Sequence, residues 1–525
     1  MSVPASVAAF ERTYETWQSE KPAATGPRGA VASQNVEAAA VGQAILKDGG
    51  NAMDAAIGTA FALTVAEPWM SGLGGGGYIT LYSAKEKAVR VVDFAMKSAK
   101  GLNPADYPLA EGTGADLFGW PAVVDDRNVN GPYSIAVPGT VAGYALAMEK
   151  YGTKSLADVI APAAALARRG HRVTWWTMLM CGADMPALQK SPATAETWLP
   201  GGFPPAMGAD PAPKFLSLGN LADTLEELAR DGAESFYRGA IGERIARDAE
   251  RLGSSVRMAD LEAYEAEIQE PLSMRRGEAT YHVPGGLTAG PSFADALKDL
   301  PAFTSSAPDA ETYAAYARTL KAAYEYRMEN LGHAGDHGDR SCTSHIAAAD
   351  AEGNIVMITT TLLSRFGSRV LFPETGIMMN NGINWFDPRP GRPNSLKPDT
   401  KPLCNMVPAV VTKDGKPWFG FGASGGRKIM PAVYQLCSFM NDFGMDMQTA
   451  LNMPRVDLSA IDTIYADTRF DEATMAALKA VAPTESWPAT TYPIMYACPL
   501  GAMVSDSGVT ASAHPTTPLS TALAV

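Results

Sequence analysis

The sequence predicts an α+β fold in which helices pack over antiparallel sheets. Apolar residues at helical spacing concentrate before residue 335, and alternating strand patterns joined by short turns follow it. The clearest helix runs from 310 to 326, where Tyr313, Tyr316, Leu320 and Tyr324 fall on one face that we expect to meet the core. This division suggests layers of helices packed over antiparallel sheets.

Start and stop signals mark the elements before residue 335. Gly49 and Gly50 end a helix at Lys47, because glycine takes the left-handed conformation at little cost. The elements expected here are a strand over 30–33, a helix ending at 47, an Ala-rich helix from 51, a strand over 78–82, and helices within 139–166, over 222–228 and over 240–251.

Two hairpins are expected after residue 335. The first joins strands over 345–349 and 355–362 through a turn at 351–354, and the second joins 407–412 and 418–422 through a turn at 413–416. A polar, glycine-rich stretch over 332–341 precedes them and is interpreted as an exposed connector.

Composition narrows the class of protein. A chain of 525 residues with 46% hydrophobic residues can bury one large core or two coupled ones. The net charge of -13 and the lack of a Lys/Arg-rich run argue against nucleic acid and anionic membranes as partners. No apolar window reaches the length of a membrane span, so none is expected.

Cysteine usage and the start of the chain bear on the compartment. The five cysteines are scattered without a CxxC pair, which suggests a reducing compartment: Cys181, Cys342, Cys404, Cys437 and Cys498. The first 21 residues show no basic segment followed by a long apolar stretch, so a signal peptide is not expected. A cytoplasmic location is the resulting prediction.

Thr343 is the candidate nucleophile. With the turn at 351–354, Asp350 faces Ile355, and the same register places Thr343 beside Thr361 and Leu362 within a slip of one residue. Cleavage before Thr343 would free an α-amino group with an unperturbed pKa of about 8, which is suited to accept the hydroxyl proton. The alternative is that Thr343 is simply a β-forming residue at the start of a strand.

Ordered sequence blocks resemble the gamma-glutamyltransferase family over nearly the whole chain. They are residues 29–33, 45–56, Glu67-Pro68 with 71–77, 137–143, Thr343-Ser344-His345, Asp350 with Gly353-Asn354, 376–381, Pro402-Leu403 and 422–426. Because the blocks occur in the family's order, their combination is far more specific than any single motif.

The resemblance implies a four-layer αββα sandwich of the N-terminal-nucleophile hydrolases. It also implies autocatalytic cleavage between Cys342 and Thr343 into a large subunit, 1–342, and a small subunit, 343–525, which stay together as a heterodimer. Thr343 would be the nucleophile, and Thr361 would hydrogen-bond its new amine. Gly425 and Gly426 would direct backbone N–H groups at the oxyanion. The substrate would be a small amide, with no metal or cofactor.

The substrate-binding positions depart from the family pattern. By position, the family's charged and polar residues for a γ-glutamyl group are replaced here by Ala95, Leu363, Gly382, Trp385, Cys404 and Asn405. A zwitterion left unpaired in such a pocket loses several kcal/mol of binding. We therefore expect an acyl group other than an ordinary γ-glutamyl group. The Pro-rich stretch 385–401 is also shorter than in lidded members, which favours water over an acceptor amine.

Four cations near the predicted site are candidates to receive an anionic acyl group, such as that of a dicarboxylic monoamide: Arg365, Arg369, Arg427 and Lys428. The alternative is that two or more of them pair with surface acids. Relatives with pockets altered in this way include cephalosporin acylases and oxamate amidohydrolases. The leading hypothesis is thus a self-processing amidohydrolase; a true γ-glutamyl hydrolase or transferase and a non-catalytic binding homologue are the alternatives.

Two other motifs are interpreted as structural. Gly72, Gly74 and Gly77 satisfy GxGxxG, but the cluster leads into a strand instead of a helix, and the sequence has no GxxxxGK[ST] loop to hold a nucleotide. The other motif consists of potential metal ligands in the connector, which are better explained by a solvated loop: His333, Asp336, His337 and Asp339.

Overall fold

Two seven-stranded antiparallel sheets form the centre of the molecule in this computed structural model, which describes residues 19–114, 118–208, 212–331 and 341–525. The β12 sheet has the order β23 (Thr521–Ala524), β2 (Gly29–Ser33), β12 (Ser341–Asp350), β13 (Ile355–Ser364), β3 (Gly76–Ser83), β4 (Ala88–Phe94) and β9 (Glu267–Gln269). The β17 sheet has the order β1 (Ala24–Gly26), β22 (Gly508–Ala513), β21 (Cys498–Ser505), β17 (Lys416–Ser424), β16 (Ala409–Lys413), β11 (Ala279–Val283) and β10 (Leu272–Arg276).

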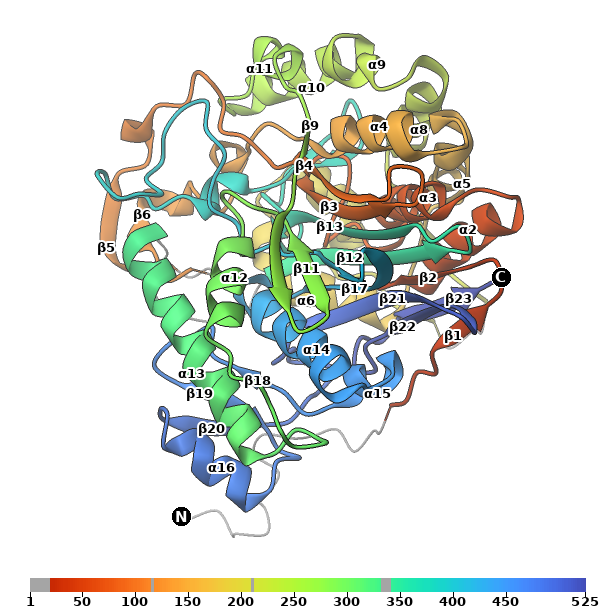
Figure 1. The fold of residues 1–525 in the computed structure, drawn as a ribbon. Coiled ribbons are helices and arrows are strands. Elements are labelled where there is room, and N and C mark those ends of the chain that lie inside the picture. The colour runs from red at the N-terminus through yellow and green to blue at the C-terminus, as the bar shows by residue number, and fades with distance from the viewer. Residues whose placement is uncertain (1–18, 115–117, 209–211, 332–340) are drawn as a thin grey trace.

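Helices cover the outer face of each sheet, as Figure 1 shows. On the β12 sheet lie α2 (Val36–Lys47), α3 (Ala52–Ala66) and α4 (Thr140–Tyr151), with α5 (Leu156–Arg169) and α8 (Leu221–Asp231) packed beyond them. On the β17 sheet lie α12 (Gly290–Lys298), α14 (Ile429–Phe443) and α15 (Met447–Asn452), with α13 (Ala310–Tyr326) packed against α12. The predicted four-layer αββα sandwich is confirmed.

Alanines make up about half of the buried residues between the two sheets. The buried cluster there contains alanines from both sheets: Ala30, Ala32, Ala347, Ala349, Ala502, Ala511 and Ala513. Strand β12 packs against β17 and β21 across this interface. Because period-2 alternation sends successive side chains to opposite faces, odd-numbered residues of β12 face the β17 sheet and even-numbered ones face α3.

Most of the predicted elements are present, although their division along the chain is wrong. The stripe of α13 is buried as expected, and α10 (Ala240–Leu252) matches the predicted helix over 240–251. However, α14, α15 and α16 (Glu472–Lys479) lie after residue 335, and each large sheet takes strands from both sides of it. Sheet formation between distant segments therefore overrides the apparent separation of helices and strands.

The remaining α-helices and strands of the described residues lie outside the elements named so far. They are α6 (Trp175–Leu188), α7 (Pro192–Trp198), α9 (Glu234–Tyr237), α11 (Met258–Glu262), β5 (Leu109–Thr113), β6 (Pro121–Val123), β7 (His171–Arg172), β8 (Phe215–Leu216), β14 (Leu371–Phe372), β15 (Ile377–Met378), β18 (Val456–Asp457), β19 (Ile464–Asp467) and β20 (Thr484–Trp487). Within the described ranges, no helix has both the length and the apolar composition that crossing a membrane requires.

Candidate active site

Thr343 lies opposite Thr361 and Leu362, as the turn register predicts. Near the turn the pairing is one residue off the prediction, since Ala349 faces Ile355. A bulge between Cys342 and Ser344 then sets two residues of β13 against Thr343 alone. The Thr343 hydroxyl donates to Thr361 Oγ1 at 3.2 Å, and both residues are buried.

Thr361 is itself fixed by its own strand and by the glycine cluster. Its Oγ1 accepts a hydrogen bond from the backbone N–H of Leu363 at 2.8 Å. A Cβ on Gly75 would lie 2.3 Å from the Thr361 carbonyl oxygen, and one on Gly77 would lie 2.2 Å from that of Thr359. The cluster is therefore a close-packing surface under β13, in agreement with the rejection of a nucleotide loop.

Next to Thr343 and Thr361, a histidine and a further threonine form another polar pair on the same face of the hairpin. His345 Nδ1 lies 3.0 Å from Thr359 Oγ1, on the same face of the β12–β13 hairpin as Thr343. Burial lowers the pKa of His345 to about 3, which keeps its imidazole neutral at physiological pH. The site around Thr343 thus consists of neutral hydroxyl and imidazole groups without an ionised partner among these four residues.

The opposite face of β12 carries a second polar contact that the sequence interpretation missed. Ser71 Oγ donates to Ser344 Oγ at 2.9 Å, and Ser344 Oγ donates to Glu67 Oε2 at 3.4 Å. All three side chains are buried, and burial raises the pKa of Glu67 to about 8. The sequence feature that could have indicated this contact is an acidic residue, Glu67, directly after the apolar helix α3.

Gly425 and Gly426 form the turn that follows β17. Their φ angles are 134° and 54°, in the region that glycine reaches without strain. A Cβ on Gly425 would lie 2.9 Å from the Cα of Ala497, so the turn is tightly backed. The short helix Gly426–Lys428 packs against β12, and the Tyr324 hydroxyl donates to the Arg427 carbonyl. The two predicted oxyanion glycines are therefore held near the strand that carries Thr343.

Four of the six predicted substrate-binding residues belong to one buried apolar cluster: Ala95, Leu363, Trp385 and Cys404. We call it the aromatic cluster, because it also includes Tyr78, Tyr107, Phe118, Trp120 and Phe386. Leu363 enters it with a φ of 83° immediately beyond the Thr343 bulge. These four positions, expected from the sequence to be apolar, therefore pack together in the structure.

The other two predicted substrate-binding residues border the cluster. A Cβ on Gly382 would lie 2.9 Å from the side chains of Ala136 and Met96, which are both members of the cluster. Asn405 is buried, and its Oδ1 accepts a hydrogen bond from Arg327 at 3.3 Å. Within the Pro-rich stretch 385–401, Asn394 donates to the Trp385 carbonyl at 2.6 Å.

The four candidate cations have different environments. Arg365 and Arg369 pair with Asp184 of α6 at 2.5 and 3.5 Å, and this acid is buried rather than at the surface as the alternative expected. Arg427 is buried with its guanidinium 5.5 Å from the centre of the Phe118 ring in the aromatic cluster. Lys428 is also buried, beside it in the same turn. Arg427 is thus packed on a ring of the aromatic cluster, which contains four of the predicted substrate-binding residues.

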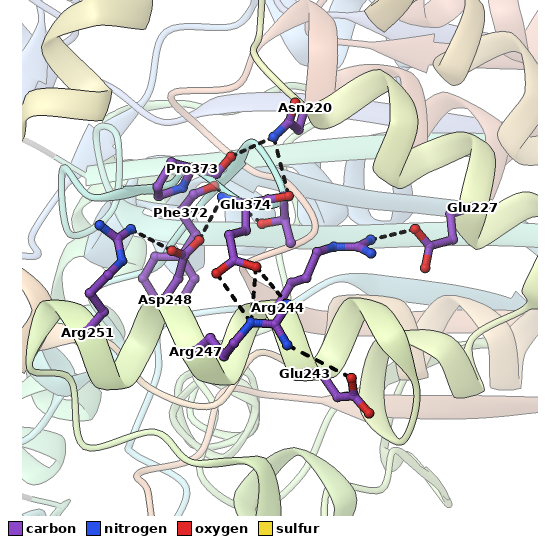
Figure 2. Close-up of polar contacts among 11 residues, drawn as sticks. Asn220, Glu227, Glu243, Arg244, Arg247, Asp248, Arg251, Phe372, Pro373 and Glu374 are labelled. Carbon is purple, nitrogen blue, oxygen red and sulfur yellow. Dashed lines mark hydrogen bonds and ion pairs between the residues drawn. The ribbon is translucent and has the colours of Figure 1, made fainter.

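Two asparagines after the β14–β15 hairpin connect the glycine cluster, the segment before α4 and the end of β13. Asn380 Nδ2 donates to the carbonyls of Gly74 and Ala136 at 2.7 and 2.9 Å, and Asn381 Nδ2 donates to Ser364 Oγ at 2.8 Å. The hairpin is tied in turn to α10 by an ion pair and a hydrogen bond of Glu374, and to the start of α8 by a hydrogen bond from Asn220. Figure 2 shows Arg247 and Arg251 of α10, with Asp248, Glu374 and Asn220, around this turn.

Part of the prediction lies outside the described residues. The connector residues considered as metal ligands fall within 332–340, and the side chain of Cys342 at the predicted cleavage site is not described. Among the residues that are described, no group of three or more His, Cys, Asp and Glu side chains is arranged to hold a metal ion.

Comparisons with known proteins identify the family. The gamma-glutamyltranspeptidase family model matches residues 38–339 and 332–485. An Acylase ACY 1 proenzyme of Pseudomonas sp. (strain V22) is 32% identical over 83% of this chain and 84% of its own length. The glutathione hydrolase proenzyme of Bacillus subtilis (strain 168) is 29% identical over 82% and 81%, respectively.

A solved structure shares the fold. The crystal structure of cephalosporin acylase from Bacillus halodurans has a TM-score of 0.84 to this chain at 23% identity, and covers 98% of this chain and 99% of its own. The match of the family model over most of the chain agrees with the ordered motifs and the layered fold. The chain belongs to the gamma-glutamyltranspeptidase family and is an enzyme of its N-terminal-nucleophile hydrolase and acyltransferase type.

Proposed function

We propose that the chain is the precursor of an amide hydrolase that cuts itself between Cys342 and Thr343 and then uses Thr343 as nucleophile. The observation that carries this proposal is the 3.2 Å contact between the Thr343 and Thr361 hydroxyls at the bulge. A buried, oriented hydroxyl at the start of a strand is what an amino-terminal nucleophile requires.

Self-cleavage proceeds in two steps: an ester bond first replaces the peptide bond, and water then hydrolyses the ester. The Thr343 hydroxyl attacks the carbonyl carbon of Cys342, so an ester replaces the peptide bond and the Thr343 nitrogen is released as an amine. Water then hydrolyses the ester and gives fragments 1–342 and 343–525. Thr361 orients the attacking hydroxyl through the contact described above.

Turnover repeats the attack on a substrate amide. The free α-amine of Thr343, with an ordinary pKa of about 8, takes the hydroxyl proton and later gives it to the leaving amine. Backbone N–H groups of Gly425 and Gly426 donate to the oxyanion, an interaction of a kind typically worth about 10²–10³ in rate. Water then hydrolyses the acyl-enzyme, releases the acid and restores the Thr343 hydroxyl.

The proposed acyl group has an apolar stem and an anionic end, as in a dicarboxylic monoamide. Leu363 and Trp385 belong to the aromatic cluster, which supports binding of the apolar stem. Arg427, packed on Phe118 of this cluster, supports recognition of the carboxylate, because a guanidinium matches that group bidentately. The acylase relative is consistent with a substrate other than glutathione.

A γ-glutamyl hydrolase or transferase acting on glutathione-like substrates is the second candidate, because a glutathione hydrolase is among the relatives. A panel of p-nitroanilides separates the two. We expect glutaryl or oxalyl anilides to be hydrolysed faster than the γ-glutamyl anilide, and the reverse order would contradict the proposed acyl group. A processed protein that hydrolyses none of them would indicate a non-catalytic binding homologue.

Denaturing electrophoresis with intact-mass measurement tests self-cleavage. The purified wild type is expected to give fragments 1–342 and 343–525, whereas Thr343→Ala is expected to remain one chain of 525 residues. Thr412→Ala is a matched control, since it removes a buried threonine of β16 far along the sheet from the turn at Gly425. A wild type that remains intact after long incubation would refute self-activation.

A further inference from the structure

Cleavage before Thr343 would leave the nucleophile on the first residue of a strand. In the uncut chain, Ser341 and Cys342 pair with Ser364 and Leu363 and thereby hold the strand before Thr343. After cleavage this covalent connection is gone, and chain ends that lack other contacts fray. The mature site therefore needs contacts that fix the new end of β12.

Backbone pairing alone provides few of these contacts. The bulge takes Thr343 out of the regular ladder, so the first paired residue after it is Ser344, opposite Thr360. On the other side of β12, pairing with β2 begins only at Ile346. Residues 343–345 consequently have a strand partner on one side, and side-chain contacts must contribute to their order.

Ser344 supplies such a contact on the face opposite Thr343. Its hydroxyl lies 2.9 Å from Ser71 Oγ and 3.4 Å from Glu67 Oε2. Glu67 is at the C-terminal end of α3, and Ser71 opens the glycine cluster that packs under β13. Both partners belong to buried parts of the predicted large fragment, whereas Ser344 belongs to the small one.

We propose that Glu67 and Ser71 anchor the new amino terminus, because they hold Ser344 and so keep the Thr343 hydroxyl directed at Thr361. The anchor rests on the proposed function, since it acts only in a cleaved chain. Glu67 and Ser71 are positioning residues: they contact neither Thr343 nor, as we infer, the substrate. Successive side chains alternate across a strand, so fixing Ser344 on one face fixes Thr343 on the other.

The Glu67 carboxyl group acts in its neutral form. Burial raises its pKa to about 8, and its hydrogen bond with Ser344 opposes this rise without cancelling it. A neutral carboxyl retains a carbonyl oxygen that accepts the Ser344 hydrogen bond. Glutamine has the same shape and offers the same acceptor, so Glu67→Gln should preserve the anchor, whereas Glu67→Ala removes it.

The test compares self-cleavage with turnover in Glu67→Ala, Glu67→Gln and the control Thr64→Val. Thr64 is buried one turn earlier, in α3, and its hydroxyl has no hydrogen-bond partner within the described ranges. The half-time of cleavage is followed by electrophoresis, and kcat is measured on the fully cleaved proteins with an anilide that the wild type hydrolyses. Urea unfolding of each variant monitors stability.

For Glu67→Ala we expect kcat to fall about tenfold or more, because a loosened nucleophile loses its alignment. Self-cleavage should slow no more than about threefold, since residues 341 and 342 still hold the strand in the uncut chain. Glu67→Gln and Thr64→Val should keep kcat within about twofold of the wild type.

Two results would overturn the anchor alone in an active wild type: an unchanged kcat in Glu67→Ala, or equal losses of cleavage and turnover that Glu67→Gln does not restore. The second result would indicate a purely structural role. A wild type that stays uncut refutes the proposed function and the anchor together, so the two failures are distinguishable.

Discussion

The β12–β13 hairpin and the aromatic cluster meet on one strand, two residues apart, yet they are held together in different ways. Thr343, Thr361 and His345 are fixed by specific hydrogen bonds. Leu363, Trp385 and their neighbours are fixed by apolar packing. Directional contacts tolerate little change, whereas a packed apolar wall accepts other shapes at a modest cost. Under the proposed function, this difference would let substrate preference change while the reaction is retained.

The largest effect is expected in the hairpin. Thr361→Val keeps the shape but removes the hydroxyl that accepts from Thr343. We expect self-cleavage to slow about 10²–10³-fold, because the attacking hydroxyl loses its orienting partner. Timed electrophoresis measures this rate. Thr361→Ser should restore most of it, and a Val variant that cleaves like the wild type would show that the contact is incidental.

The second prediction concerns stability on the other face of β12. Burial raises the pKa of Glu67 to about 8 in the folded state, against an ordinary value of about 4.5. Between these values the unfolded chain loses the proton and the folded chain keeps it, so the free energy of unfolding falls as pH rises. Below about pH 4.5 the contribution of Glu67 to the free energy of unfolding is fully present, and above about pH 8 this contribution falls no further.

Urea unfolding of Thr343→Ala at pH 5 and pH 8, with and without Glu67→Gln, measures this term in a chain that stays uncut. We expect the variant with Glu67 to lose a few kcal/mol more between the two pH values, because each pKa unit corresponds to about 1.4 kcal/mol. Identical pH dependence in the two proteins would mean that Glu67 ionises normally in the folded state.

The smallest effect is expected in the aromatic cluster. Trp385→Ala should lower kcat/KM for a glutaryl anilide about tenfold, because part of the apolar wall is lost, while self-cleavage remains within about twofold of the wild type. Trp418→Ala is the control, since Trp418 lies near Lys413 at the far end of β17. If Trp385→Ala blocks self-cleavage, the two regions are not separable.

The sequence predicted the hairpin register because a short turn fixes which residues face each other. It did not predict the bulge, since an extra residue in β13 leaves the alternation on either side unchanged. Helix α14 was missed for another physical reason. Every residue from Ile429 to Met440 is buried, so most of the helix lacks the exposed polar stripe that marks a helix at the surface.

Partners distant in the sequence were also beyond prediction. Asp184 lies 181 residues before Arg365, and nothing local marks it as the acid that both arginines share. The contact of Glu67 with Ser344 spans 277 residues. Motif positions single out Gly425, Gly426 and Thr361 only as candidate site residues, and which other side chains hold them follows from the packing of the two sheets.

The order of strands determines whether the two fragments of a cleaved molecule could separate. In the β12 sheet, β2 from before residue 342 lies between β23 and β12 from after it, and β13 pairs with the earlier strand β3; the β17 sheet is mixed as well. Separating the fragments would break backbone ladders in both sheets at once. We therefore expect no exchange of fragments between cleaved molecules: each small subunit keeps, for life, the large subunit with which it was synthesised.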